Sequence, residues 1–491
     1  MIRLRVAAIA ALACSLAVAD EAAAQEPAPA SGTSADAAPG VTSFLIENVT
    51  RVELWRFFEP DPEGGDEPDY LFGGNRAVLG VHYDGPRWAL RGAIQYVRAE
   101  NLPRGAIGPG LLGNGGAYYF QAAGTFSYQF YLRALSAEYR APSRGLSIEV
   151  GRLSFMPEPM AGPVDPAERL AQERLAGRLL GDMDGSLYER AWDGGRVQVG
   201  RGGWLWSAAA ALPTQGTFEE SANLPIDRLG VAALDVTAAP GTLLERTRFQ
   251  AFAIGYRDTR DVHARPDNSD VPATAVDVAI GTVGVSATGV YPTDSGAWDL
   301  TASAAGQFGD WYGQSHRAMS ALVEAGYRWR EAPGRPLVRA GAIYASGDGN
   351  GGDDRHGTFF AMLPSGDRHV RSNTYALMNA VDVWGEARLE PHRELHLQAA
   401  VHHVTLASSA DRWYSGSGAT ERRGNYFGYQ GRDTVGAGTL GWITEGEVVW
   451  QPVRWWTLSA YAGHFAGGDA VAALFAGPRL FTATLVSRFS F

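Results

Sequence analysis

Charged side chains recur at alternate positions along several segments of this chain, a spacing that could build a charged lining. Residues 87–96 show it, where Trp88, Leu90, Ile94 and Tyr96 alternate with Arg87, Arg91 and Gln95. Successive side chains of a β-strand point to opposite faces, so each such segment has one apolar and one polar face. Where strands close around water, charges on the inner face can select ions.

This alternation places eight arginines on the inner face, and we predict that they line an anion path: Arg51, Arg76, Arg87, Arg91, Arg196, Arg328, Arg339 and Arg388. It also places Arg488 there, with the carboxylates Glu53, Asp84, Glu149, Glu324, Asp382, Glu386, Glu445 and Glu447. A local excess of arginine favours anions. Alternatively, these charges pair across neighbouring strands and only stabilise a hydrated wall.

A helix is expected between Asp165 and Gly181. Asp165 suits an N-cap, Pro166 suits the first turn and Gly181 can end the helix. Three arginines lie on it: Arg169, Arg174 and Arg178. Either this loop folds into the barrel as a constriction and presents these arginines to an anionic solute, or it lies outside over lipopolysaccharide.

Residues 348–354 (DGNGGDD) resemble the start of a calcium-binding loop, because oxygen-bearing side chains recur at short intervals. The candidate ligands are Asp348, Asn350, Asp353 and Asp354. The position where a calcium loop carries its last glutamate is Phe359. The loop therefore either holds calcium or is simply solvated, and we expect no other cofactor.

Other chemistries are disfavoured. A net charge of −11 argues against a nucleic-acid partner. The chain has no G-x-S-x-G or H-E-x-x-H motif, so we expect no enzyme; the alternative is a lipid-hydrolysing barrel that uses Ser408 and His403. A receptor with a folded plug domain is excluded, because residues 25–42 are too short to supply one.

The elements that must position these residues are short strands. From Ser43 onward, amphipathic segments of about ten residues are separated alternately by short turns and long polar loops. The turns, rich in Pro, Gly, Asp and Ser, are expected at 83–86, 141–145, 202–203, 239–241, 292–296, 332–334, 391–392 and 452–453. Nine longer segments fall between them, the largest near 98–125, 157–189, 347–379 and 407–438.

Eight turns and nine loops join about eighteen strands. We therefore predict an all-β fold, a transmembrane antiparallel β-barrel with short periplasmic turns and long extracellular loops. A soluble sandwich or propeller would also alternate, but Trp and Tyr crowd the strand ends as in a membrane-interface girdle. The last strand alternates and ends on Phe491, which is typical of barrels that the barrel-assembly machinery recognises.

Three parts are expected in the chain. Residues 1–24 form a signal peptide, residues 25–42 a flexible periplasmic linker and residues 43–491 the outer-membrane barrel. The one cysteine, Cys14, lies in the signal peptide, so the mature chain can form neither disulfides nor Cys-ligated zinc. We expect the outer membrane of a Gram-negative-type bacterium, with both termini in the periplasm.

Three stretches carry a resemblance to a known family. The first is 173–181 (ERLAGRLLG) with 188–196 (YERAWDGGR) and 212–219 (LPTQGTFE); the second is 344–348 (YASGD) with 357–359 and 362–364; the third is 411–416 (DRWYSG) with 429–432 and 438–441. Together they resemble the alginate export family of outer-membrane proteins, over nearly the whole mature chain. The resemblance implies a monomeric eighteen-stranded porin with an Arg-lined path for an anionic polysaccharide.

We therefore predict a channel that passes an anionic hydrophilic solute by diffusion, an exopolysaccharide of the alginate type. The alternative is a general or small-anion uptake porin. The expected partners are outer-membrane lipid and lipopolysaccharide, the barrel-assembly machinery and periplasmic polysaccharide export proteins.

Overall fold

The structure, a computed structural model, describes residues 40–60, 67–108, 113–154, 166–215, 224–261, 267–269, 273–365, 370–415 and 431–491. The predicted signal peptide and most of the predicted linker lie outside the described residues. The first strand begins at Val41, two residues before the expected start of the barrel.

Eighteen strands in the described part of the chain form one closed antiparallel sheet. They are β1 (Val41–Arg56), β2 (Asp69–Asp84), β3 (Trp88–Glu100), β4 (Phe126–Ala141), β5 (Leu146–Leu153), β6 (Trp192–Arg201), β7 (Trp204–Pro213), β8 (Leu229–Ala238), β9 (Thr247–Asp258), β10 (Val278–Pro292), β11 (Gly296–Trp311), β12 (Gln314–Trp329), β13 (Leu337–Ala345), β15 (Ala380–His392), β16 (Leu395–Thr405), β19 (Thr439–Val453), β20 (Trp456–Gly467) and β21 (Arg479–Ser490).

The barrel closes where β1 meets the last strand. On one side β1 pairs with β2, and on the other it pairs antiparallel with β21 from Glu47–Ser490 to Arg56–Phe481. A closed sheet leaves no strand edge with unpaired backbone groups, as the interior of a bilayer requires. The predicted eighteen-stranded antiparallel barrel is therefore confirmed.

Eight short connections lie at one end of the barrel, which we call the short-turn end: 85–87, 142–145, 202–203, 239–246, 293–295, 330–336, 393–394 and 454–455. Six of them overlap the predicted turns. The last two begin about two residues later than predicted, because Pro391 and Pro452 sit inside strand ends where the register shifts. Proline lacks an N–H for the ladder and is tolerated at such irregularities.

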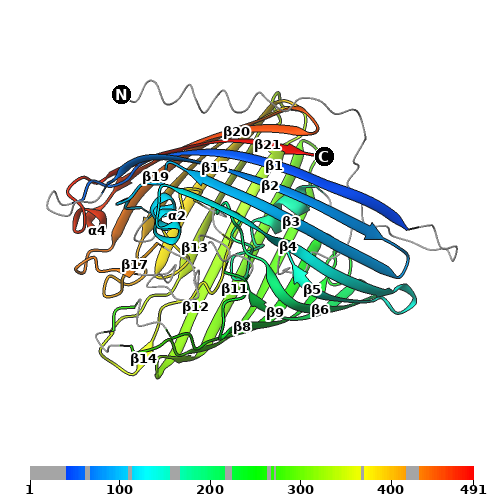
Figure 1. The fold of residues 1–491 in the computed structure, drawn as a ribbon, viewed down its shortest axis with the longest axis horizontal. Helices are drawn as coiled ribbons and strands as arrows, with labels where there is room; N and C mark the ends of the chain where they lie inside the picture. The colour runs from blue at the N-terminus through cyan, green and yellow to red at the C-terminus, as the bar shows by residue number, and fades with distance from the viewer. Residues whose placement is uncertain are drawn as a thin grey trace.

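The opposite end, which we call the long-loop end, carries the other connections and the short helices α2 (Gly113–Ala122) and α4 (Asp469–Ala472) (Figure 1). The sequence predicts nine long connections at this end, but the connection between β11 and β12 is only two residues, Tyr312 and Gly313. Both residues take a positive φ, so they turn the chain at once. Two-residue strands, β14 (Arg355–His356) and the pair β17 (Trp413–Tyr414) and β18 (Gly431–Arg432), lie within the loops.

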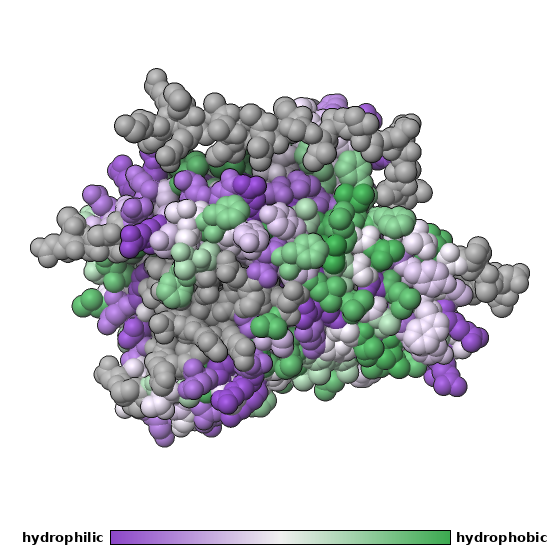
Figure 2. Space-filling view, viewed as in Figure 1, coloured by the Kyte–Doolittle hydropathy of each residue, from purple (hydrophilic) through white to green (hydrophobic). Residues whose placement is uncertain are grey.

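Apolar side chains cover the outside of the barrel wall. Trp88, Leu90, Ile94 and Tyr96 are all exposed, as the alternation predicts, and hydrophobic side chains gather over the wall between hydrophilic ends (Figure 2). Among the described residues, no helix combines the length and apolarity needed to cross a membrane. The start of β1 and the end of β21 both lie at the short-turn end, because Val41 pairs with Asp84 and Ser490 pairs with Glu47.

Candidate functional site: the lumen and its inward segments

Residues 166–191, in the connection between β5 and β6, fold into the barrel. Both strands meet this connection at the long-loop end, yet Glu168 pairs at 2.7 Å with Arg248, near the short-turn end of β9. Helix α3 (Pro166–Glu173) packs against β10 and β11. Residues 166–191, which we call the first inward segment, therefore reach deep into the lumen and return. Of the two placements weighed from the sequence, the structure has the one inside the barrel.

The predicted helix is shorter than expected. It ends at Glu173 rather than near Gly181, because Gly177 adopts a left-handed φ of +72° that breaks the helical repeat. Arg174 and Arg178 thus follow the helix instead of lying on it. Asp165, the expected N-cap, lies outside the described residues.

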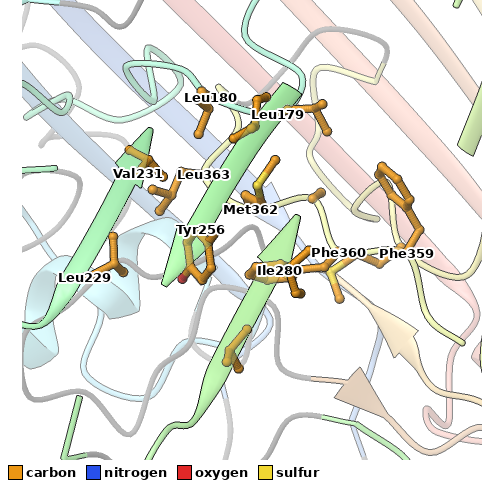
Figure 3. Close-up of a cluster of buried hydrophobic side chains, with 14 of the residues drawn as sticks. Leu179, Leu180, Leu229, Val231, Tyr256, Ile280, Phe359, Phe360, Met362 and Leu363 are labelled. Atoms are coloured by element: carbon orange, nitrogen blue, oxygen red, sulfur yellow. The ribbon is translucent and has the colours of Figure 1, made fainter. Parts of the chain in front are cut away.

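A second inward segment comes from the connection between β13 and β15. Residues Phe359–Leu363 are almost completely buried. They pack with Leu179 and Leu180 of the first inward segment against Leu229, Val231, Tyr256 and Ile280 of the inner wall (Figure 3). Burial of this much apolar surface helps to hold the two segments in place.

The two inward segments are joined by backbone hydrogen bonds. The N–H of Gly181 donates to the carbonyl of Leu363 at 2.8 Å, and the N–H of Leu363 donates to the carbonyl of Leu179 at 2.9 Å. Ser365 adds a bond from its N–H to Gly177 at 2.7 Å. Arg190, fully buried, donates to the carbonyls of Gly181 and Leu363, and burial lowers its pKa to about 10. The segments thus form one body within the lumen.

Polar side chains of the wall hold the second segment. Gln307 bonds both the N–H and the carbonyl of Phe360, each at 2.8 Å, as a neighbouring strand would. At the long-loop end, His316 and His356 meet through their Nδ1 atoms at 2.8 Å. His356 stacks on Trp311 at 4.3 Å between ring centroids.

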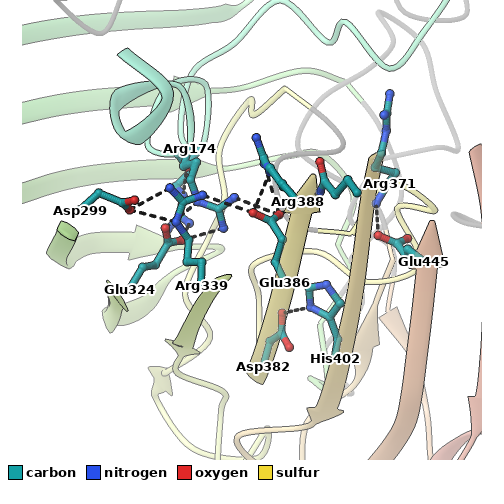
Figure 4. A network of polar contacts seen from close by, with 12 residues as sticks. Arg174, Asp299, Glu324, Arg339, Arg371, Asp382, Glu386, Arg388, His402 and Glu445 are labelled. Atoms are coloured by element: carbon teal, nitrogen blue, oxygen red, sulfur yellow. Dashed lines mark hydrogen bonds and ion pairs between the residues drawn. The ribbon is translucent and has the colours of Figure 1, made fainter. Parts of the chain in front are cut away.

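A network of arginines and carboxylates joins the first segment to the opposite wall (Figure 4). Arg174 donates to both carboxylate oxygens of Glu324, at 2.6 and 3.2 Å, and lies 4.5 Å from the ring centroid of Trp384. Burial alone would lower the pKa of the Arg174 guanidinium, but the charge and hydrogen bonds of Glu324 outweigh it and the pKa is raised. Arg178 lies 3.8 Å from Glu324.

Arg339 and Arg388 complete this network. Arg339 donates to Asp299 at 2.8 Å and to Glu386 at 3.3 Å, and Arg388 donates to Glu386 at 2.8 Å. Arg174 also approaches Glu386, at 3.6 Å. We call Arg174, Arg178, Arg339, Arg388, Asp299, Glu324 and Glu386 the constriction network. Its four guanidinium groups share three carboxylates.

Neighbouring inward residues of β15 and β19 are also paired. His402 Nδ1 lies 2.9 Å from Asp382, which accepts a further bond from the Tyr375 hydroxyl at 2.6 Å. Glu445 accepts from the Tyr461 hydroxyl at 2.5 Å and Glu447 pairs with Arg371. These carboxylates are therefore engaged by neighbouring groups.

The arginines predicted to line the path on β1, β2, β3, β6 and β12 have carboxylate partners. Arg51 pairs with Glu53 at 2.7 Å, and Arg76 pairs with Glu47 at 2.9 Å and with Glu189 of the first inward segment. Glu149 accepts from Arg91 at 2.5 Å and from Arg196 at 2.7 Å. Arg328 pairs with Glu390 at 2.8 Å. Their alternation places them inside, and each has a carboxylate partner, although the side chain of Arg91 remains 36% exposed.

Two predicted site residues lie elsewhere than expected. Arg87 is exposed in the turn between β2 and β3, because Gly85 and Pro86 end the strand before it. Arg169 lies on the exposed face of α3, since Glu168 and Gln172 face the wall. It has no ion pair among the residues that the structure describes.

Sequence reasoning missed several residues that build the lumen. Arg133 pairs with Glu189 and donates to the carbonyl of Arg190 at 2.7 Å, and Arg248 anchors α3. The run FFAML at 359–363 falls within the segment 347–379, which the sequence predicts as a long external loop. Five consecutive residues with little polarity would be costly in water, and that run was the available signal of an inward segment.

The residues of the calcium-like loop make local contacts. Asn350 Oδ1 accepts from the N–H of Gly352 at 3.2 Å, and Asp353 Oδ1 accepts from the N–H of Arg355 at 2.9 Å. Across the described ranges, no group of three or more His, Cys, Asp or Glu side chains is placed to hold a metal ion. Calcium binding by Asp348, Asn350, Asp353 and Asp354 stays a prediction.

The residues of the alternative hydrolase are not brought together. His403 packs against Trp442 at 4.6 Å between ring centroids, whereas the Ser408 hydroxyl donates to the carbonyl of Asp348 at 2.8 Å. The fold is of the channel type.

The closed barrel, its apolar outer band and its charged lumen define an outer-membrane channel of the porin type. A profile of the family described as Alginate export matches residues 168–475. The chain belongs to this family, as the sequence resemblance indicated. No curated protein matches the chain.

Solved porins of Pseudomonas aeruginosa share the fold. The outer-membrane protein OpdK is 10% identical, with a TM-score of 0.53 and coverage of 91% of this chain and 99% of OpdK. A structure of OpdK with vanillate has a TM-score of 0.54 at 10% identity, covering 91% and 98%. OccK2 (OpdF) in complex with glucuronate has a TM-score of 0.52 at 10% identity, covering 92% and 96%.

Proposed function

We propose that this protein passes an anionic, hydrophilic solute, an exopolysaccharide of the alginate type, through the lumen by diffusion. The observation that carries the proposal is the constriction network, in which four guanidinium groups share three carboxylates beside the inward segments. A carboxylate of the solute can take the place of a wall carboxylate on one arginine after another, because carboxylate–guanidinium bonds are similar in either case. Charged rings of this kind are how pores select.

In this proposal, the short-turn end and both chain termini face the periplasm, and the long loops face outward into lipopolysaccharide. The constriction network has one more guanidinium group than carboxylates, a small positive excess that attracts an anion without trapping it. Conduction requires binding that is strong enough for entry and weak enough for release.

A second candidate is the uptake of small carboxylates. The support for it is that similar folds were solved with vanillate and with glucuronate, both carboxylates. The two candidates differ in solute size, so blockade of the ionic current by glucuronate and by galacturonate oligomers distinguishes them. Longer and more frequent blockades by the oligomers support the polysaccharide.

The test of the shared proposal is the reversal potential of single channels under a salt gradient. We expect anion selectivity in the wild type and a smaller anion preference in Arg91→Glu and Arg339→Glu. Arg91→Glu is the more informative of the two variants. The side chain of Arg91 is 36% exposed and can meet a solute, whereas that of Arg339 is 2% exposed. Cation selectivity of the wild-type channel would defeat the proposal.

A further inference from the structure

The turns at the short-turn end carry a series of exposed arginines. They are Arg87, Arg144, Arg246, Arg330, Arg335, Arg393 and Arg454 within the turns, and Arg201 at the last position of β6 beside one. Of the eight turns described, only 293–295 has no arginine within it or directly before it. We call these eight residues the turn arginines.

Few carboxylates accompany them. The same turns contain Glu245, Asp294, Glu331 and Glu394. Asp84, at the last position of β2, lies beside a turn as Arg201 does. Eight arginines against these five carboxylates leave an excess of three positive charges. The whole chain, by contrast, has a net charge of −11. The short-turn end is thus opposite in sign to the protein as a whole.

Several turn arginines form no ion pair with the residues that the structure describes. Arg246, Arg335 and Arg393 lie 3.0 to 3.8 Å from Glu245, Glu390 and Glu394. Within the described ranges no ion pair is formed by the other five: Arg87, Arg144, Arg201, Arg330 and Arg454. The arginines of the lumen, by contrast, are paired. A carboxylate partner is present for each of Arg76, Arg91, Arg174, Arg196 and Arg339.

This contrast separates two kinds of arginine. A guanidinium already held by a wall carboxylate is neutralised locally and its field at a distance is weak. An exposed guanidinium without a partner acts over about one Debye length, roughly 10 Å at 0.1 M salt. The positive charge that a solute meets first is therefore at the short-turn mouth and not in the lumen.

We propose that the turn arginines form a capture surface for a linear carboxylated saccharide at the short-turn mouth of the channel. This inference rests on the proposed function. Arginines spread around a rim suit a flexible chain with repeated carboxylates, which can contact several of them in turn and replace one weak contact by another. Arg169, exposed on α3 near the same end, extends the surface into the lumen.

Such a surface would raise the rate at which the solute reaches the mouth of the channel. Charge of one sign around a mouth raises the local concentration of an oppositely charged solute, and steered association falls steeply with ionic strength. Capture from the short-turn side should therefore be faster than capture from the long-loop side, and the difference should shrink as salt is added.

The test counts blockade events of oligogalacturonate in single channels at low salt, with the probe added to one side at a time. The side is identified with Ser143→Cys, in an exposed turn, and a membrane-impermeant thiol reagent; Cys14, the one native cysteine, lies in the predicted signal peptide. The ring variant changes Arg87, Arg144, Arg201, Arg330 and Arg454 to Gln. The matched control makes the same change at five exposed arginines toward the long-loop end: Arg104, Arg228, Arg317, Arg355 and Arg479.

We expect event frequency from the short-turn side to exceed that from the other side by at least about threefold, and the ring variant, but not the control, to remove the difference. Equal frequencies from both sides, or equal losses in ring and control variants, would overturn the inference. Absence of the difference in bilayers of neutral phosphatidylcholine, where no anionic lipid headgroup competes for the turn arginines, would also overturn it. If the channel is cation-selective and the probe blocks from neither side, the proposed function itself fails.

Discussion

Arg174 and Glu324 join the first inward segment to the barrel wall across 150 residues of sequence. Two hydrogen bonds of 2.6 and 3.2 Å connect the guanidinium to the carboxylate, and both side chains are at most 10% exposed. A bidentate pair of this kind fixes orientation as well as distance. It sets where the first inward segment stands in the lumen, and so how wide the path beside it can be.

We predict that Arg174→Met and Glu324→Gln each lower the free energy of unfolding in detergent by roughly 3 kcal/mol, because each removes the nearest counter-charge of a buried partner. The counter-charges that remain are farther away, Arg178 at 3.8 Å from Glu324 and Glu386 at 3.6 Å from Arg174. The double variant should lose less than the sum of the two, since neither member of the bidentate pair is left buried without the other. Urea titration of all three variants checks this. Additive losses would mean that the pair is not coupled.

The architecture of the barrel could be predicted from the sequence because its signal is local. The alternation in Trp88–Tyr96 and the Gly and Pro of the turns are each visible within about ten residues. The strand number follows from counting the turns. The two misplaced turns involve Pro391 and Pro452, where the sequence signal of a turn and of a bulge is the same.

The lumen could be predicted only in part. Alternation tells which face Arg91 or Arg339 occupies, but the partner of each depends on side chains of other strands and of the inward segments, such as Glu149 for Arg91 and Glu386 for Arg339. Loops have no sequence periodicity that would tell whether they fold into the lumen or lie outside the barrel. The arginines expected to be open to a solute are thus paired, and the open ones lie in turns, where a sequence pattern normally signals only solvation.

Contact between the two inward segments depends on Gly181. A Cβ atom added there would lie 2.2 Å from Ser365 Oγ and 2.5 Å from the Ser365 backbone nitrogen. We predict that Gly181→Ala separates the segments, raises single-channel conductance and destabilises the protein by about 1–3 kcal/mol. Gly349→Ala, where nothing lies within 4 Å, is the control. A conductance unchanged in both would show that the segments do not limit the path.

The contact between His316 and His356 should make the second inward segment sensitive to acid. Two Nδ1 atoms at 2.8 Å can share one proton, with one ring donating and the other accepting. A second proton would place two N–H groups against each other, although Asp267, 3.9 Å from His356 Nε2, can balance one positive ring. We expect current noise to rise as the pH falls, and His356→Phe, which keeps the stacking on Trp311, to respond less. An identical acid response in the variant would exclude the pair as its cause.

Asp411 should make the loops more stable as the pH falls, whereas the pair of His316 and His356 should make the second inward segment less ordered. Its carboxylate accepts from the hydroxyls of Thr358 and Tyr414 and from the N–H groups of Asp348 and Arg412, and so joins the second inward connection to the loop after β16. Burial raises the pKa of Asp411 to about 6, although these four hydrogen bonds lower it. The folded protein therefore binds the proton more tightly than the unfolded chain does, and stability rises as the pH falls from about 6 toward the ordinary value of 3.8.

The change should amount to roughly 3 kcal/mol at most, because each pKa unit corresponds to about 1.4 kcal/mol. Unfolding free energies measured between about pH 4 and pH 7 should show this slope in the wild type. Asp411→Asn, which cannot titrate, should flatten it and lower stability at acidic pH through the loss of hydrogen bonds. A wild-type slope of the opposite sign, or the same slope in the variant, would show that the carboxyl group of Asp411 does not control the stability of the loops.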